Sequence, residues 1–169
     1  MKPHQLCKQC NAWMLDHTLI GWRRCPSCNY RVKKEKAMIS ITELNPKNYV
    51  LDSDETDNIN SLLEKINKVR TLYAKPMIVT SGFRSLQDHL RIYADKGITD
   101  IKKIPMASRH LYGEAVDISD PDGKLAEWTK NNVAALEEIG LWCEDLAHTK
   151  GWVHYQIVAP KSGNRFFIP

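Results

Sequence analysis

Apolar residues recur three and four positions apart in two stretches of the chain, which predicts two long amphipathic helices. The first stretch follows the acidic segment 54–57 and contains Ile59, Leu62, Leu63, Ile66 and Val69. The second contains Leu125, Trp128, Leu136 and Ile139 and ends at Gly140. Because this spacing gathers apolar side chains on one helix face, we expect a helix over roughly 55–73 that covers a sheet and a second long helix up to Gly140.

Shorter apolar runs predict four strands, at residues 76–80, 115–119, 141–144 and 152–158. The first strand should be buried and should deliver Arg84 at its end. In the second, Asp117 shares one face with Ala115 and Ser119, since alternate residues of a strand point the same way. The last two would form a hairpin with a seven-residue loop. Together these elements predict an α+β fold in which helices pack on a small antiparallel sheet.

Two further segments complete this picture. Ser85 would cap a helix that runs to about residue 94 and that Gly97 ends, with His89 on it in a structural or solvent-facing position. The tail ends in the apolar residues Phe166, Phe167 and Ile168. They should fold back over the core; exposed, they would instead form a contact patch for a partner.

Four cysteines near the N-terminus stand in two Cys-x-x-Cys pairs: Cys7, Cys10, Cys25 and Cys28. Paired units of this kind bind one zinc ion tetrahedrally with no open position, so this zinc would be structural. Disulfides or a redox dithiol are the alternatives, but the thioredoxin type uses a single such pair inside an α/β domain. A segment of fewer than forty residues cannot bury enough apolar surface to fold unaided. Zinc binding would therefore supply the missing stability.

Charge separates this zinc ribbon from the rest of the chain. Residues 1–36 hold eight Lys and Arg against Asp16 and Glu35, a net charge of +6, which leaves −2 for the remainder of a chain with a total of +4. The charged run 33–36 is typical of a linker. We therefore assign residues 1–36 to the ribbon with its basic linker and residues 37–169 to a second domain of ordinary size for one core.

The basic ribbon has three interpretations. It could contact an anionic polymer of the cell envelope, it could contact nucleic-acid phosphates, or its charges could simply solvate a small domain. Aromatic and basic residues do not alternate in the manner of a nucleic-acid reading motif, which disfavours the second. No apolar run is long enough to span a bilayer, and the first seven residues lack the apolar segment of a secretory signal, so we expect synthesis to end in the cytosol.

The main domain carries a candidate set of metal ligands. His110 and Asp117 lie seven residues apart, with Gly113 between them to permit a bend, and His154 follows far downstream. Two imidazoles and a carboxylate are the ligands of an open zinc site, in which a fourth position holds a water with a pKa of about 7. Spacing alone is equally consistent with ordinary polar residues.

The segment from Ser108 to Asp117 reads Ser-x-His-x-x-Gly-x-Ala-x-Asp. This motif resembles that of the zinc D-Ala-D-Ala carboxypeptidase family, which includes vancomycin-resistance dipeptidases and phage endolysins. Residues 80–85 resemble the Ser-Gly-Tyr-Arg segment that precedes the motif in that family, and residues 152–154 resemble its late histidine segment. The likeness covers roughly residues 38–158, in the same order.

The resemblance implies that His110, Asp117 and His154 bind the catalytic zinc. It also implies that Arg84 holds the substrate carbonyl oxygen as an oxyanion develops and that Ser108 contacts the bound peptide. A fixed guanidinium aimed at developing negative charge agrees with that role for Arg84, although an arginine after a strand can also be a plain surface residue.

The general base is where the chain departs from the family pattern. Many relatives carry an acidic residue three positions before the last zinc histidine, where this chain has Gly151, and some carry a histidine where it has Trp152. We choose Glu144 as the base, because a glutamate on the preceding strand faces the metal in the similar hedgehog branch of this fold. As a diagonal neighbour across paired strands it would lie about 7 to 8 Å away. Asp145 and His148 are rivals, and Glu144 could also be a solvated strand end.

The resemblance thus implies a zinc peptidase that cleaves peptidoglycan stem peptides, as a D-Ala-D-Ala carboxypeptidase or as an L-Ala-D-Glu type endopeptidase. A wall-directed activity without a secretory signal is typical of a phage lysin or a virion-associated enzyme, which would reach the bacterial cell wall from the cytosol or from outside. Gly151 motivates the alternative, a non-catalytic wall-binding or structural virion protein that keeps the fold.

Overall fold

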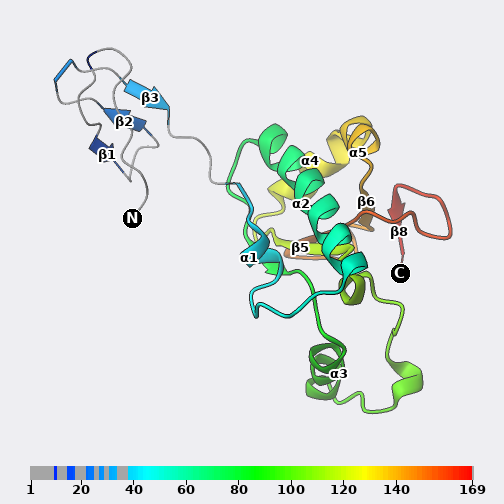
Figure 1. Ribbon diagram of the computed structural model, residues 1–169. Coiled ribbons are helices and arrows are strands. Elements are labelled where there is room, and N and C mark those ends of the chain that lie inside the picture. The colour runs from blue at the N-terminus through cyan, green and yellow to red at the C-terminus, as the bar shows by residue number, and fades with distance from the viewer. Residues whose placement is uncertain are drawn as a thin grey trace. The chain divides into compact units, whose positions relative to one another are not determined.

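The computed structural model describes Cys10, residues 15–17, 22–24, 27–28 and 31–33, and all of residues 38–168. Contacts between residues divide the chain into two compact units, Met1–Ala37 and Met38–Pro169 (Figure 1). Each unit has a sheet of its own, so each is described by itself.

The N-terminal unit contains a three-stranded antiparallel sheet in the order β1 (Leu15–His17), β2 (Trp22–Arg24) and β3 (Arg31–Lys33). Two of the four cysteines proposed to bind structural zinc, Cys7 and Cys25, lie outside the described residues. Cys10 and Cys28 are described and both lie in turns. The structural zinc therefore stays a prediction from the sequence.

The second unit is built on a five-stranded sheet in the order β4-β5-β7-β6-β8. Its strands are β4 (Val79–Ser81), β5 (Ala115–Ser119), β6 (Trp142–Glu144), β7 (Trp152–Gln156) and β8 (Phe166–Phe167). All neighbours pair antiparallel except β6 and β8, which run parallel. The predicted α+β class is confirmed, but the antiparallel sheet was wrong in this one respect. The sheet is mixed because the apolar tail returns beside β6 in the same direction.

The helices of this unit are α1 (Ile41–Leu44), α2 (Ser53–Tyr73), α3 (Leu86–Asp95), α4 (Lys124–Asn131) and α5 (Val133–Ile139), with 3-10 turns η1 (Ile101–Lys103) and η2 (Arg109–Tyr112). Asp52 caps α2 by accepting a hydrogen bond from the Glu55 N–H, and the Glu55 side chain accepts one from the Asp52 N–H. This reciprocal capping box explains the sharp start of the helix. Among the helices of the described residues, none is long and apolar enough to cross a membrane.

One long helix predicted up to Gly140 proved to be two, α4 and α5. The break falls at Asn132, whose backbone leaves the helical region (φ −124°, ψ 40°) and whose side-chain amide donates to the Trp128 carbonyl at 2.7 Å. A side chain that caps the last turn of a helix in this way competes with continuation of the backbone ladder. The apolar periodicity is nevertheless preserved, because Leu125 and Leu136 are both buried.

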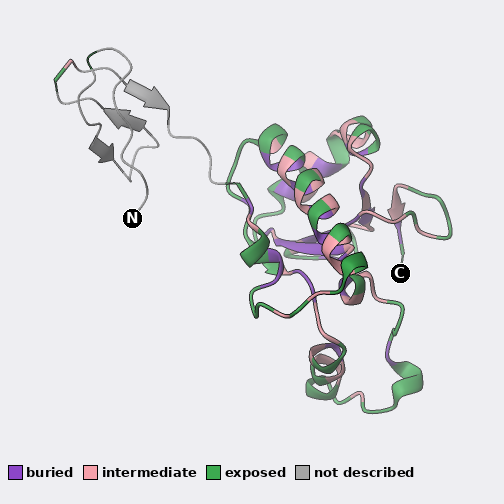
Figure 2. Ribbon diagram, in the orientation of Figure 1, coloured by how far each residue is buried: buried purple, intermediate pink, exposed green. Residues whose placement is uncertain are grey.

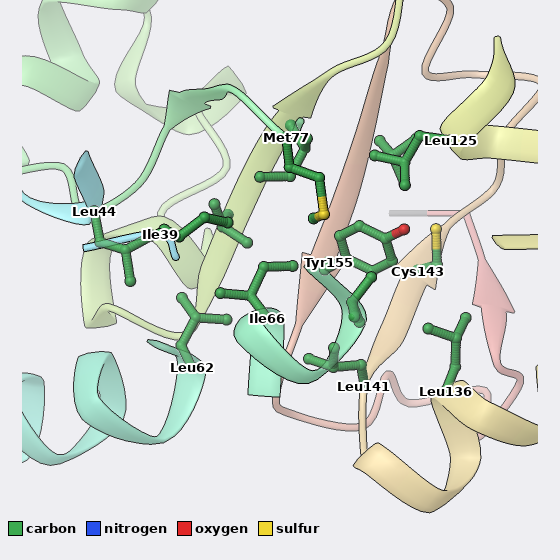
Figure 3. Close-up of a cluster of buried hydrophobic side chains, with 14 of the residues drawn as sticks. Ile39, Leu44, Leu62, Ile66, Met77, Leu125, Leu136, Leu141, Cys143 and Tyr155 are labelled. Atoms are coloured by element: carbon green, nitrogen blue, oxygen red, sulfur yellow. The ribbon is translucent and has the colours of Figure 1, made fainter. Parts of the chain in front are cut away.

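The core lies between α2 and one face of the sheet. Buried α2 residues pack with alternate residues of the central strands; they include Ile59, Leu62, Ile66, Val69, Val116, Ile118, Val153 and Tyr155. Figure 2 shows the buried strand β5, and Figure 3 shows Tyr155 beside Cys143 within this cluster. Because strand side chains alternate, the remaining residues of the same strands face the opposite side of the sheet.

Candidate metal centre

Five residues from five strands form a row across the face of the sheet opposite the core. The strand registers pair Ser81 with Asp117 and Asp117 with His154. Continued by one residue, the β6–β7 register places Glu144 beside His154, and Glu144 pairs with Phe167 of β8. Directly opposed strand residues share a face, with Cβ atoms about 4.5–5.5 Å apart. The backbone ladder itself therefore sets Asp117, His154 and Glu144 side by side.

This row lines a cavity of about 1030 Å³. Other lining residues come from α3 and its C-cap, from the segment before and within η2, and from the segments after β7 and β8; they include Tyr93, Lys96, Pro105, Ser108, Arg109, His110, Lys161 and Ile168. Arg84 lines it as well. The cavity thus brings together residues from position 80 to position 168 of the chain.

Three side chains in this cavity offer their ligand atoms to one point. Nε2 of His110 lies 3.3 Å from Oδ1 of Asp117, and Nδ1 of His154 lies 2.8 Å from the same oxygen. All three ligand atoms lie within 4.8 Å of one another, and all three residues are buried. The structure therefore gathers the three residues named from the sequence as metal ligands.

A backbone contact fixes the ring of His110. Its Nδ1 lies 2.8 Å from the carbonyl oxygen of Gly82. A carbonyl oxygen can only accept, so Nδ1 carries the hydrogen and Nε2 presents its lone pair toward Asp117. Such an outer hydrogen bond from a histidine to a carbonyl is the usual support of a metal-ligating imidazole. Gly113, in the left-handed region (φ 70°), then turns the chain from η2 into β5.

The electrostatics of the three side chains fit a cation. Burial lowers the pKa of His110, which favours its neutral form. Burial alone would raise the pKa of Asp117, but hydrogen bonds and attraction from His110 and His154 hold it well below its ordinary range. With the hydrogen on its Nδ1, His110 presents an acceptor at Nε2 to the Asp117 carboxylate, which also accepts, so their close approach is favourable with positive charge between them. Two imidazole nitrogens and one carboxylate oxygen also match the donor set of an open zinc site.

Gly82 is required where it stands, because a Cβ there would lie 2.1 Å from the backbone oxygen of Leu44. We expect Gly82→Ala to destabilise the fold by about 1–3 kcal/mol, the usual range for overpacking, and to weaken metal binding by displacing the carbonyl that holds His110. Gly97→Ala is the matched control, since its Cβ would meet nothing within 4 Å, although its φ of 76° strains any side chain. Thermal unfolding and metal titration of both variants would test this; equal metal affinity in the two would contradict it.

Arg84 reaches the centre from the segment that follows β4. Its Nε donates to Oγ of Ser81 at 2.9 Å, and its Nη2 donates to Oδ2 of Asp117 at 3.2 Å. Its backbone N–H donates to the His110 carbonyl at 3.0 Å, which ties this segment to η2. The guanidinium is therefore held at the edge of the metal centre and not as a plain surface residue.

Glu144 lies in the cavity, half-buried, directly beside His154 and not at the diagonal position expected from the sequence. The diagonal expectation was wrong because the hairpin register pairs Cys143 with Tyr155, which aligns the next residues opposite each other. Burial raises the pKa of Glu144, and nearby Asp117 raises it further, whereas His154 opposes the change. Among the described residues, the carboxylates that line the cavity are Asp117 and Glu144.

The two rivals for the base, Asp145 and His148, lie in the loop after β6. Their side chains are 40% and 54% exposed, and Nδ1 of His148 lies 3.6 Å from Oδ1 of Asp145. Gly151, directly before β7, adopts φ 88°. Of the three candidates for the base, Glu144 lines the cavity, whereas Asp145 and His148 do not.

The remaining expectations concern the surroundings of the centre. Ser108 lines the cavity, as its suggested contact with substrate requires. His89 is fully buried and packs on the Tyr93 ring at 5.0 Å between centroids, so it is structural and not solvent-facing. Phe167 is buried as predicted for the tail, whereas Ile168 is 69% exposed at the cavity. Sequence reasoning missed Ser81 and the Gly82 carbonyl, although their place between β4 and Arg84 was a usable signal.

Comparisons with known proteins found similarity to a solved structure. No family model matches the sequence, and no curated protein matches it. The chain is similar to the crystal structure of an L-Ala D-Glu endopeptidase, ChiX, from Serratia marcescens, with 19% sequence identity and a TM-score of 0.44. The match covers 72% of this chain and 99% of that one. What can be inferred about function therefore rests on the residues of this chain.

Proposed function

We propose that this protein is a zinc-dependent peptidase that hydrolyses the stem peptides of peptidoglycan. The observation that carries the proposal is the arrangement of His110, Asp117 and His154 in one cavity with Arg84 and Glu144. Metal-assisted peptide hydrolysis needs three metal ligands, a positively charged side chain to stabilise the developing oxyanion, and a carboxylate base. The likeness of the sequence motifs to the zinc D-Ala-D-Ala carboxypeptidase family supplies the substrate class.

Each residue has a distinct task in this proposal. Zinc, when bound by the three ligands, would polarise the scissile carbonyl and make a water nucleophilic at neutral pH. Arg84, held by Ser81 and Asp117, would donate to the carbonyl oxygen as negative charge grows on it. Glu144 would accept a proton from the attacking water and pass it to the leaving amine. A carboxylate with a raised pKa suits both halves of that transfer.

Basic side chains along the cavity fit a substrate that carries carboxylates. Lys96, Arg109 and Lys161 line it together with Arg84. Arg109 pairs with Glu114 at 3.0 Å, and Lys96 lies 5.3 Å from the centre of the Tyr93 ring. Stem peptides are acidic, so positive charge near the metal centre would attract and orient them. Both a D-Ala-D-Ala carboxypeptidase and an L-Ala-D-Glu type endopeptidase would act on such a chain.

The alternative is a non-catalytic protein that binds the cell wall or builds a virion and keeps the metal centre. Gly151 motivated it, because the usual acid is missing there. The place of Glu144 in the cavity favours hydrolysis over this alternative, since a carboxylate stands beside His154 from another strand. The proposal includes action on the bacterial cell wall, as a phage lysin or a virion-associated enzyme. It also includes contact between the zinc ribbon and an anionic polymer.

Metal analysis combined with peptidoglycan digestion tests the proposal. We expect purified full-length protein to contain zinc and to release stem-peptide fragments whose masses identify the bond that is cut. Treatment with a chelator should stop the release, and zinc should restore it. Metal-loaded protein that cleaves no wall type would favour the non-catalytic alternative, and a preference for iron over zinc would redirect the assignment, because two histidines and one carboxylate also bind Fe(II).

A further inference from the structure

Gln156 is a buried amide next to the metal centre that the proposed chemistry does not use. It lies on β7 two residues after His154, so both side chains share the cavity face. The residue is 4% exposed, and its Oε1 lies 3.4 Å from Nε2 of His154. A buried amide is costly unless its polar atoms are paired, which makes its orientation informative.

The orientation of this amide follows from its second contact. Nε2 of Gln156 donates to the carbonyl oxygen of Val158 at 2.5 Å. Because a carbonyl oxygen only accepts, the NH2 group must face Val158 and the amide oxygen must face His154. The side chain is thus anchored at one end by the backbone of the segment that follows β7.

An amide oxygen facing an imidazole nitrogen calls for a hydrogen on that nitrogen. With its Nε2 hydrogen directed at Gln156, His154 turns the lone pair of Nδ1 toward Oδ1 of Asp117, 2.8 Å away. We propose that Gln156 is a positioning residue that holds the His154 ring with Nδ1 toward the metal. This inference rests on the metal centre of the proposed function, and it adds a residue to which neither the motif nor the chemistry assigned a role.

The two histidines of the centre are then oriented by different means. His110 donates from Nδ1 to a backbone carbonyl and binds through Nε2, whereas His154 donates from Nε2 to a side chain and binds through Nδ1. A backbone carbonyl cannot be removed by substitution, but the Gln156 amide can. Outer hydrogen-bond partners of metal-ligating residues change metal affinity by about 10- to 100-fold when they are lost.

The test compares Gln156→Met, which fills a similar volume without the amide oxygen, with Thr129→Val in full-length protein. Thr129 is fully buried, and its hydroxyl forms a hydrogen bond with the hydroxyl of Tyr155, which, like Gln156, lies on β7. Thr129→Val therefore removes a buried hydrogen bond to the same strand, but on the core side and away from the metal centre. Titration with Co²⁺ measures the metal affinity of the site formed by His110, Asp117 and His154. Co²⁺ bound by the four cysteines would show thiolate charge-transfer absorption, so binding at the two sites can be told apart. NMR of the zinc-loaded protein reports the His154 Nε2 hydrogen.

We expect Gln156→Met to bind Co²⁺ about 10- to 100-fold more weakly and its His154 Nε2 hydrogen to exchange faster with water, whereas Thr129→Val keeps both properties of the wild type. Wild-type affinity together with an unchanged Nε2 resonance in Gln156→Met would overturn the inference. So would an equal loss of affinity in the two variants, since it would make the effect one of general stability. Failure of the wild type to bind metal in the cavity would instead count against the proposed function.

Discussion

Replacement of Asp117 by asparagine should remove metal from the cavity and abolish peptide hydrolysis without unfolding the protein. Asparagine keeps the shape of the side chain but lacks the negative charge that His110, His154 and Arg84 share. The site would then present two neutral imidazoles and a neutral amide, a poor set for a divalent cation. Loss of the metal should cost more than the roughly 10²- to 10⁴-fold that one general base contributes. Metal analysis after dialysis and the rate of fragment release measure both effects.

Asp120→Asn is the matched control for this variant. Asp120 is also a buried carboxylate, but it accepts hydrogen bonds from the N–H groups of Leu125 and Ala126 at the start of α4. Its amide variant should lower thermal stability, because the amide offers only one oxygen to two donors, and should still bind metal. Retention of zinc and activity by Asp117→Asn would contradict the ligand assignment.

Glu144→Gln should retain metal and lose activity. The amide has nearly the shape of the carboxylate but cannot accept the proton of the attacking water, so we expect kcat to fall by about 10²- to 10⁴-fold. Glu144 contributes no ligand atom to the cluster of His110, Asp117 and His154, so zinc content should equal that of the wild type. Initial rates on purified peptidoglycan, with metal content measured on the same sample, separate the two effects.

Asp145→Asn serves as the control, because it makes the same change on the neighbouring residue, which pairs with His148 in the loop after β6. It should keep near-normal kcat. The assignment of the base would be reversed by the opposite pattern, in which Asp145→Asn is inactive and Glu144→Gln is active. Loss of zinc from Glu144→Gln would show that Glu144 supports the metal and not the proton transfer.

Periodicity was sufficient to predict the elements that carry the core. The apolar spacing of Ile59 to Val69 predicted a helix over 55–73, and the structure has α2 over Ser53–Tyr73. The alternation around Asp117 likewise predicted β5, with Val116 and Ile118 buried on the core side. These predictions succeeded because burial of one face is a local property of the sequence.

Other features depend on contacts between distant segments, which periodicity does not record. The break at Asn132 arises because a side chain caps α4 within a pattern that remains helical. The parallel placement of β8 depends on where the tail finds an open edge of the sheet. In the candidate site, the three metal ligands were predicted from the resemblance of the sequence motif. The position of Glu144 opposite His154, by contrast, depends on the register of the hairpin, which only the structure gives. The place of Gln156 on the same face as His154 was readable from the period of two, but its hydrogen bonds were not.

The two faces of the central strands divide stability and chemistry between alternate residues. In β7, Val153 and Tyr155 are fully buried in the core, while His154 and Gln156 face the cavity. The cavity-facing and core-facing positions of this strand are therefore separate sets of residues. A substitution at a cavity-facing position would therefore change the chemistry of the cavity without altering the packing of Val153 and Tyr155 on the other face of the same strand.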